Sequence, residues 1–178
     1  MEIQRKALFL DRDGIINVDH GYVHTQEGFE FIQGIFTLVR HFVSKGYQIF
    51  VVTNQSGIGR GYYNQAQFHT LTTWMIERFQ SESIYIEKVT FCPHLPSEGC
   101  HCRKPRTGMI EEITQSYPLD LKSSYFIGDK QSDMDLAREA GIGQSIAISL
   151  LPLADASMHF LTISACQEYL EENPDKIL

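Results

Sequence analysis

Two aspartates stand near the start of the chain, in the sequence Asp11-Arg12-Asp13-Gly14, directly after an apolar run over residues 7–10. The apolar run predicts a short buried strand. Because side chains two positions apart on an extended chain point to the same side, both carboxylates can reach one crevice. An isolated pair of this kind is also typical of a turn that closes a strand, so it does not establish an active site alone.

A third carboxylate strengthens the case for a site. Asp129 follows another apolar run, residues 125–127, through Gly128. Three carboxylates gathered at one sheet edge repel one another, and a hard divalent cation such as Mg²⁺ relieves that repulsion. We therefore expect Asp11, Asp13 and Asp129 to form a catalytic magnesium site.

Groups that could stabilise a phosphoryl group are also present. A bound Mg²⁺ typically holds a phosphate oxygen, and the transferring phosphoryl group then needs further positive charge and donors. Thr53 offers a hydroxyl at the end of a second apolar run, and Lys104 lies in the basic cluster Arg103-Lys104-Pro105-Arg106. A basic cluster alone is usually a solvated surface turn, which is the competing interpretation.

Cysteine and histidine form a second candidate metal site. Cys92, His94, Cys100 and Cys102 give the spacing C-x-H-x5-C-x-C. Three thiolates and one imidazole suit tetrahedral Zn²⁺, and four protein ligands leave no open position, so we expect a structural site. His101 competes with His94 as the fourth ligand, and the alternative is a set of unrelated free thiols.

Short apolar runs alternate with helical patterns along the whole chain. The runs that predict strands cover residues 7–10, 48–52, 88–91, 125–127 and 145–148. Helical spacing of apolar residues predicts one helix that ends at Gly46, another that begins at the cap residue Asn64, and a third over 164–171 that buries Cys166. This alternation favours an α/β fold with a mostly parallel sheet covered on both faces, whose ligands bind beyond the carboxyl ends of the strands.

Composition and charge limit the partners. Fifteen Lys plus Arg against 22 Asp plus Glu give the 178 residues a net charge of −7, which disfavours nucleic-acid binding outside a local basic cluster. No signal pattern, long apolar run or linker is visible, so we expect a single domain over residues 1–178, with its zinc loop at 92–102. We further expect a cytoplasmic monomer that binds neither nucleic acid nor membrane.

Four motifs occur in a fixed order, each at a predicted strand end: DRDG, TNQ, RKP and GDKQSD. Together they resemble the motifs of the haloacid dehalogenase superfamily of phosphotransferases, and the longer stretches LFLDRDGIINVDHGYVH and FVVTNQSGIGRGY resemble its histidinol-phosphatase-like family. The resemblance extends from Leu8 to about Ile148. It implies a three-layer Rossmann-like fold without a large cap domain, and hydrolysis of the C7 phosphate of D-glycero-D-manno-heptose 1,7-bisphosphate to heptose 1-phosphate.

The resemblance also implies roles for the matching residues. Asp11 would attack phosphorus and form an aspartyl-phosphate, and Asp13 would be the general acid and base. Mg²⁺ would be held by the Asp11 and Asp129 carboxylates and the Asp13 backbone carbonyl, and Thr53 and Lys104 would hold the phosphoryl oxygens. The family pattern selects His94 as the zinc ligand.

The substrate contacts are likewise implied by the resemblance. They are Asp19, His20, Gly21, Tyr22, Thr53, Asn54, Gln55, Ser56, Arg103, Lys104 and Lys130. Two residues stay unassigned: Asp133 either orients Lys104 or a metal-bound water, or stabilises a helix N-terminus, and Arg60 has no specific motif.

Three other functions remain open at this point. The short zinc loop resembles that of histidinol-phosphate phosphatases, whereas DHGYVH and TNQSGIGRG favour the heptose substrate. A zinc-stabilised binding module without activity is the second alternative, and a DNA-end phosphatase, disfavoured by the net charge, is the third.

Overall fold

The computed structural model describes residues 4–177 and contains one sheet of six parallel strands in the order β3-β2-β1-β4-β5-β6. The strands are β1 (Ala7–Leu10), β2 (Gln48–Asn54), β3 (Ile86–Cys92), β4 (Tyr125–Gly128), β5 (Gln144–Ile148) and β6 (Met158–Phe160). The predicted α/β class with a parallel sheet is therefore confirmed.

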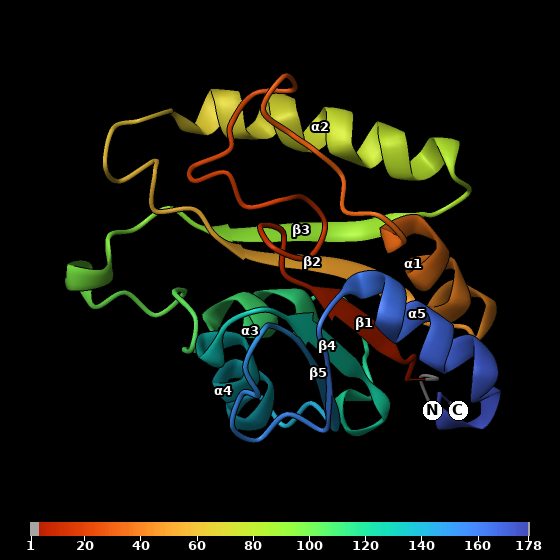
Figure 1. Ribbon diagram of the computed structural model, residues 1–178. Helices are drawn as coiled ribbons and strands as arrows, with labels where there is room; N and C mark the ends of the chain where they lie inside the picture. Colours follow the sequence, from red (N-terminus) through yellow and green to blue (C-terminus); the bar gives the residue numbers. More distant parts are fainter. Residues whose placement is uncertain (1–3, 178) are drawn as a thin grey trace.

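Five α-helices cover the two faces of the sheet. They are α1 (Ile35–Ser44), α2 (Gln65–Ser81), α3 (Gly108–Thr114), α4 (Gln131–Glu139) and α5 (Ile163–Glu172). Helices α1, α2 and α5 share one hydrophobic cluster with the sheet, and α3 and α4 share the other. Figure 1 shows the resulting three layers, with α2 running along β3 and β2 at the top of the view.

Burial on both faces of the sheet makes strand β1 a continuous apolar run in the sequence. Leu8 and Leu10 pack into the cluster under α1, α2 and α5, while Ala7 and Phe9 pack into the cluster under α3 and α4. All four side chains are fully buried. A strand buried on both faces cannot alternate apolar with polar residues, so only its length identifies it as a strand.

The predicted helix boundaries follow local chemistry. Asn64 caps α2, because its Oδ1 accepts from Gln67 N at 2.9 Å and Gln67 Oε1 accepts from Asn64 N at 2.9 Å. Gly46 follows α1 with a φ of +82°, which ends the helix. The sequence did not predict α3 or β6, because one has seven residues and the other three, too few to show a period.

The strand order determines where polar side chains meet. The chain passes from β1 to β2 and β3 on one side, and then returns to place β4 on the other side of β1. The ends of β1, β2 and β4 therefore enclose a crevice at the point where the order reverses. Within residues 4–177 we find no helix of the length and apolar character that crossing a bilayer requires.

Candidate active site and metal centre

Three carboxylates lie together at this edge of the sheet. Oxygen atoms of Asp11, Asp129 and Asp133 lie within 4.8 Å of one another. Asp11 follows β1, Asp129 follows β4, and Asp133 is in the first turn of α4. Gly14 permits this approach: its φ is +89°, and a Cβ there would lie 2.3 Å from Asp129 Oδ2.

Lys104 is the counter-ion of this acidic cluster. Its Nζ lies 2.9 Å from Asp11 Oδ1 and 2.8 Å from Asp133 Oδ1, and it donates to the backbone oxygen of Val52 at 2.9 Å. Burial by itself lowers the pKa of Lys104, but the charges of Asp11 and Asp133 outweigh it and raise the pKa above its usual value. The ammonium group therefore stays charged although it is buried.

Asn54, at the end of β2, fixes the loop that carries Lys104. Its Oδ1 accepts from Lys104 N at 3.0 Å, and its Nδ2 lies 3.4 Å from Lys104 O. Both ends of the Asn54 amide thus engage the Lys104 backbone. Asn54, predicted as a substrate contact, also holds a distant loop against the sheet.

The electrostatics of the cluster fit a bound cation. Burial raises the pKa of Asp11, with the Lys104 charge opposing and the Asp133 charge adding to the shift. Burial and the Asp11 charge raise the pKa of Asp129 to about 8. Asp129 Oδ1 is buried and has no hydrogen-bond partner among residues 4–177. A divalent ion beside Asp11 and Asp129 would remove their repulsion and satisfy this oxygen, so the donors fit Mg²⁺.

Asp133 combines the two roles that the sequence left open. Its Oδ1 faces Lys104, and its Oδ2 accepts from the backbone N–H groups of Asp129 at 3.1 Å and Lys130 at 3.2 Å. The side chain therefore orients Lys104 and also stabilises the beginning of α4. It is fully buried.

The Asp13 carboxylate is held separately from the acidic cluster. Its Oδ1 accepts from Arg12 Nη2 at 2.9 Å and from Asn17 Nδ2 at 3.0 Å. Its Oδ2 accepts from Gln55 Nε2 at 3.0 Å. These donors hold a single orientation of a side chain that faces the adjacent cavity.

That cavity has a volume of about 350 Å³ and opens beside the acidic cluster. Its lining contains ten of the predicted site residues: Asp13, Asp19, Gly21, Tyr22, Asn54, Gln55, Ser56, Arg103, Lys104 and Lys130. Tyr63 and Ser132 complete it. Two predicted contacts lie elsewhere: Thr53 is fully buried beside Gln55, and the exposed His20 has Nε2 3.0 Å from Glu30 Oε2.

Positive charge surrounds the cavity. Arg103 Nη1 is a buried donor without a hydrogen-bond partner among the residues described. Lys130 Nζ lies 3.6 Å from Asp19 Oδ2 and its side chain is about half exposed. The Arg60 guanidinium lies 5.8 Å from the centre of the Tyr22 ring, which places it against the loop at the cavity rim. The positive charge at these three positions would attract an anionic ligand.

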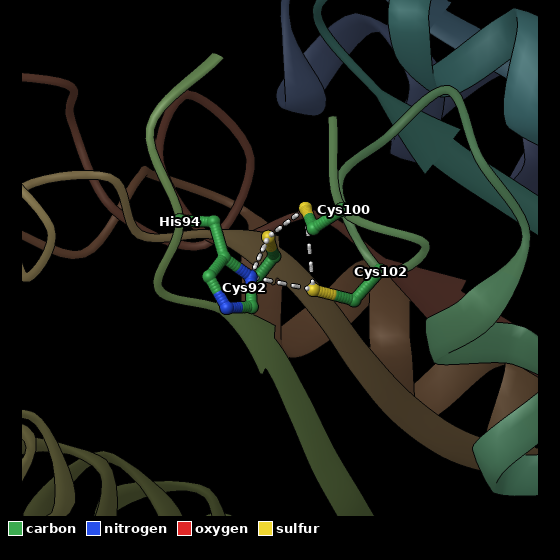
Figure 2. Close-up of side chains that lie close together, drawn as sticks. All are labelled: Cys92, His94, Cys100 and Cys102. Carbon is green, nitrogen blue, oxygen red and sulfur yellow. Dashed lines mark hydrogen bonds between the residues drawn. The ribbon is translucent and has the colours of Figure 1, made fainter. Parts of the chain in front are cut away.

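The cysteine and histidine residues of the loop converge as the spacing predicts. Figure 2 shows the side chains of Cys92, His94, Cys100 and Cys102 pointing toward one another. Cys92 Sγ lies 3.5 Å from Cys100 Sγ, and Cys100 Sγ lies 3.7 Å from Cys102 Sγ. His94 Nδ1 lies 3.2 Å from Cys102 Sγ. Zn–S bonds of about 2.3 Å in a tetrahedron place sulfurs about 3.8 Å apart, so the cluster fits such an ion.

His101, the competing ligand, points to another partner. Its Nε2 lies 2.8 Å from Glu111 Oε2 at an exposed position. Cys166 lies far from the cluster, packed in the core under α5, and burial raises its pKa to about 12. Both observations agree with the sequence analysis.

Comparison with known proteins identifies the family. A family model described as Polynucleotide kinase 3 phosphatase matches residues 8–144. The chain is 48% identical over 147 residues to the D-glycero-alpha-D-manno-heptose-1,7-bisphosphate 7-phosphatase of Campylobacter jejuni, over 83% of this chain and 84% of that protein. The chain belongs to the heptose-1,7-bisphosphate 7-phosphatase family. The predicted membership of this haloacid dehalogenase-like group is confirmed.

Other members of the heptose-1,7-bisphosphate 7-phosphatase family agree. The D-glycero-beta-D-manno-heptose-1,7-bisphosphate 7-phosphatase of Helicobacter pylori is 44% identical over 149 residues, covering 83% of this chain and 86% of that protein. The crystal structure of the D,D-heptose 1.7-bisphosphate phosphatase from B. bronchiseptica, complexed with magnesium and phosphate, superposes with a TM-score of 0.83 at 25% identity. That superposition covers 94% of this chain and 99% of that one. The names of the Campylobacter jejuni and Helicobacter pylori relatives specify different anomers, alpha and beta respectively.

Some site residues were not predicted from the sequence. Arg12 and Asn17 are buried polar residues that contact Asp13, and Tyr63 contacts Gln55. Arg12 stands between the two aspartates, which is a signal that the sequence offered. Nothing local in the sequence distinguishes Tyr63 from the exposed Tyr62 beside it.

Proposed function

We propose that this protein hydrolyses the C7 phosphate of D-glycero-D-manno-heptose 1,7-bisphosphate with Mg²⁺ and releases heptose 1-phosphate. The observation that carries the proposal is the cluster of the buried Asp11 and Lys104 with the partly buried Asp129, beside a cation-lined cavity of about 350 Å³. The relatives that match most of the chain carry this activity in their names.

In the first step the Asp11 carboxylate attacks phosphorus. The new bond joins an Asp11 oxygen to phosphorus, the bond from phosphorus to the C7 oxygen breaks, and an aspartyl-phosphate forms. Asp11 Oδ1 accepts from Arg12 N at 2.7 Å and contacts Lys104, which fixes the carboxylate for in-line attack. Asp11, Asp129 and the Asp13 backbone carbonyl would hold Mg²⁺, which when bound supplies positive charge to the phosphoryl oxygens.

Asp13 transfers the proton in both steps. Its protonated carboxyl gives a proton to the departing C7 oxygen, which then leaves as a hydroxyl. The resulting carboxylate takes a proton from the water that attacks the aspartyl-phosphate, so that phosphate and the free Asp11 carboxylate are regenerated. Lys104 balances the charge of the phosphoryl oxygens during both displacements.

The remainder of the cavity suits the sugar and its second phosphate. Arg103 has a buried donor without a partner among the described residues, and Lys130 lines the same cavity with its ammonium group 3.6 Å from Asp19 Oδ2. Asp19 and Tyr22 offer an acceptor and an aromatic face to the sugar ring. We assign the C1 phosphate to Arg103 and Lys130, since both cations lie in the lining of the same cavity.

The loop of Cys92, His94, Cys100 and Cys102 would bind Zn²⁺ in a structural role within a single domain. Cys102 stands directly before Arg103 and Lys104, so an ion at this cluster would restrain both cations. The four converging donors support the proposal, because an ion held by four protein ligands has no open position for a substrate.

Phosphate release from purified enzyme tests the function. With Mg²⁺ we expect the highest kcat/KM on a heptose 1,7-bisphosphate, with its two anomers assayed separately, and much lower values on histidinol phosphate and on a 3′-phosphorylated DNA end. EDTA should stop release, and excess Mg²⁺ should restore it. Preference for histidinol phosphate or DNA would overturn the substrate, and an inactive folded protein would favour a binding module. Asp11→Asn is the matched control: it keeps the shape of the side chain but removes the nucleophile, so this variant should fold and release no phosphate.

A further inference from the structure

Gln55 is a buried residue whose amide hydrogen-bonds to three side chains. Its Nε2 donates to Asp13 Oδ2 at 3.0 Å and to Thr53 Oγ1 at 2.8 Å, so both N–H donors are used. Its Oε1 accepts a hydrogen bond from the Tyr63 hydroxyl. Gln55 is 2% exposed, which leaves little of it for a sugar to contact. The amide therefore connects Tyr63 to the Asp13 carboxylate.

Tyr63 is held rigidly at the other end of this connection. Its ring stacks on the His24 ring with centroids 4.9 Å apart and planes 5° from parallel. Gly57 also lies against the Tyr63 ring, since a Cβ at this glycine would lie 2.2 Å from Tyr63 Cε1. Burial raises the pKa of Tyr63 to about 12, so its hydroxyl keeps the proton that it donates to Gln55.

The two carboxylate oxygens of Asp13 accept different numbers of hydrogen bonds. Oδ1 accepts from both Arg12 and Asn17, and a proton placed there would meet two donors. Oδ2 accepts only from Gln55 among the described residues, which leaves it a free lone pair for the transferable proton. Gln55 therefore sets the position of the oxygen that must reach the leaving group.

We propose that Tyr63 and Gln55 are positioning residues for proton transfer: Tyr63 fixes the orientation of the Gln55 amide, and that amide aims Oδ2 of Asp13 at the leaving oxygen. This inference rests on the proposed function, in which Asp13 protonates the C7 oxygen. Rotation of the Gln55 amide by half a turn would place Oε1 against the Asp13 carboxylate, and the Tyr63 hydroxyl opposes that rotation.

The test uses leaving groups that differ in their need for a proton. A sugar oxygen leaves poorly as an anion and needs the acid, whereas p-nitrophenolate is a stable anion and leaves without one. The quantity to compare is kcat/KM, which covers every step from free enzyme and substrate to formation of the aspartyl-phosphate. Tyr63→Phe and Gln55→Leu are each measured with heptose bisphosphate and with p-nitrophenyl phosphate.

We expect Tyr63→Phe to lower kcat/KM about 10-fold on the sugar ester and less than about 2-fold on p-nitrophenyl phosphate. Gln55→Leu should show the same selectivity with a larger loss on the sugar ester. Tyr117→Phe is the matched control, because Tyr117 donates its hydroxyl to Glu87 O at 3.1 Å on the other face of the sheet. Tyr117→Phe should leave kcat/KM unchanged on both substrates.

Equal losses on the two substrates, or no loss, would overturn the inference and indicate a merely structural contact. Asp13→Asn, measured on the same two substrates, distinguishes failure of this inference from failure of the proposed acid role of Asp13. If Asp13→Asn is selective for the sugar ester and Tyr63→Phe is not, the inference alone fails. If Asp13→Asn loses activity equally on both substrates, Asp13 is not the acid, and the inference falls together with the proposed proton-transfer step, whereas the substrate assay decides the function separately.

Discussion

Lys104 Nζ lies 2.8 Å from Asp133 Oδ1, and the same nitrogen lies 2.9 Å from Asp11 Oδ1. Lys104 belongs to the loop after the cysteine cluster, Asp133 to α4 and Asp11 to the end of β1. One ammonium group thus joins three separate parts of the chain, and it neutralises charge that the fold would otherwise bury uncompensated. The same contact places a cation where the phosphoryl group would bind.

Removal of the Lys104 charge should cost stability as well as activity. Lys104→Met leaves Asp11 and Asp133 buried without a counter-ion, which we expect to lower the free energy of unfolding by about 3 kcal/mol. Phosphate release should fall more than about 100-fold, because the phosphoryl oxygens also lose a cation. Urea unfolding and a phosphate assay measure the two effects. Lys45→Met is the control, at a partly exposed lysine whose Nζ donates to Pro174 O, and equal stability of both variants would contradict the prediction.

Mg²⁺ binding should weaken as the pH falls below 8. The pKa of Asp129 is raised to about 8, so at lower pH the ion must displace a proton from this carboxyl. We expect the Mg²⁺ affinity to fall by about tenfold for each pH unit below 8, one proton being released for each ion bound. Titration calorimetry between pH 6 and pH 9 measures it. An affinity that is constant between pH 6 and pH 8 would contradict this.

The same shift predicts the behaviour of the metal-free protein. The folded-state pKa of Asp129 is raised from 3.8 to about 8, so between these values the folded chain binds more protons than the unfolded chain. Asp129 therefore stabilises the fold least at high pH, and its contribution is lost as the pH rises toward 8. In EDTA, the wild-type Tm should fall across this window more than that of Asp129→Asn.

Gly14→Ala should abolish the response to Mg²⁺. The new Cβ would lie 2.3 Å from Asp129 Oδ2, and the φ of +89° disfavours any side chain. We expect the rise in Tm on adding Mg²⁺ to disappear, together with phosphate release. Gly46→Ala is matched for backbone strain, since its φ is +82° but its Cβ would meet nothing within 4 Å. A normal Mg²⁺ response in Gly14→Ala would show that Asp129 moves freely.

Removal of the metal should expose the two thiols that belong to the loop itself, because the loop then loses its order. With metal bound, a thiol reagent at pH 8 should label none of the cysteines rapidly. After a strong zinc chelator we expect the loop residues Cys100 and Cys102 to react, while Cys92 and Cys166 stay protected because both are fully buried and burial raises the pKa of each thiol. Mass spectrometry of the labelled peptides identifies them. Rapid labelling of Cys100 before chelation would contradict a closed four-ligand site.

The sequence predicted the main strands well and the short elements poorly. Residues 7–10 match β1 because a four-residue run buried on both faces carries its own signal. Strand β2 extends beyond its predicted run because Thr53 and Asn54 are polar yet continue the ladder. Strand β3 adds Ile86, Glu87 and Cys92 to the predicted residues 88–91. Strand β6 is partly exposed at the sheet edge, where sheet pairing rather than composition decides the conformation.

The sequence by itself determined the residue types at the strand ends, the spacing of Cys92, His94, Cys100 and Cys102, and the family to which these motifs belong. Only the tertiary structure decided which side chains bond to one another. In the structure Asp133 pairs with Lys104, Asn54 bonds to the Lys104 backbone, and Tyr63 bonds to Gln55. Strand order and helix packing bring Lys104 to Asn54 and Asp133, and the loop after β2 turns back to bring Tyr63 to Gln55. No local pattern encodes such distances.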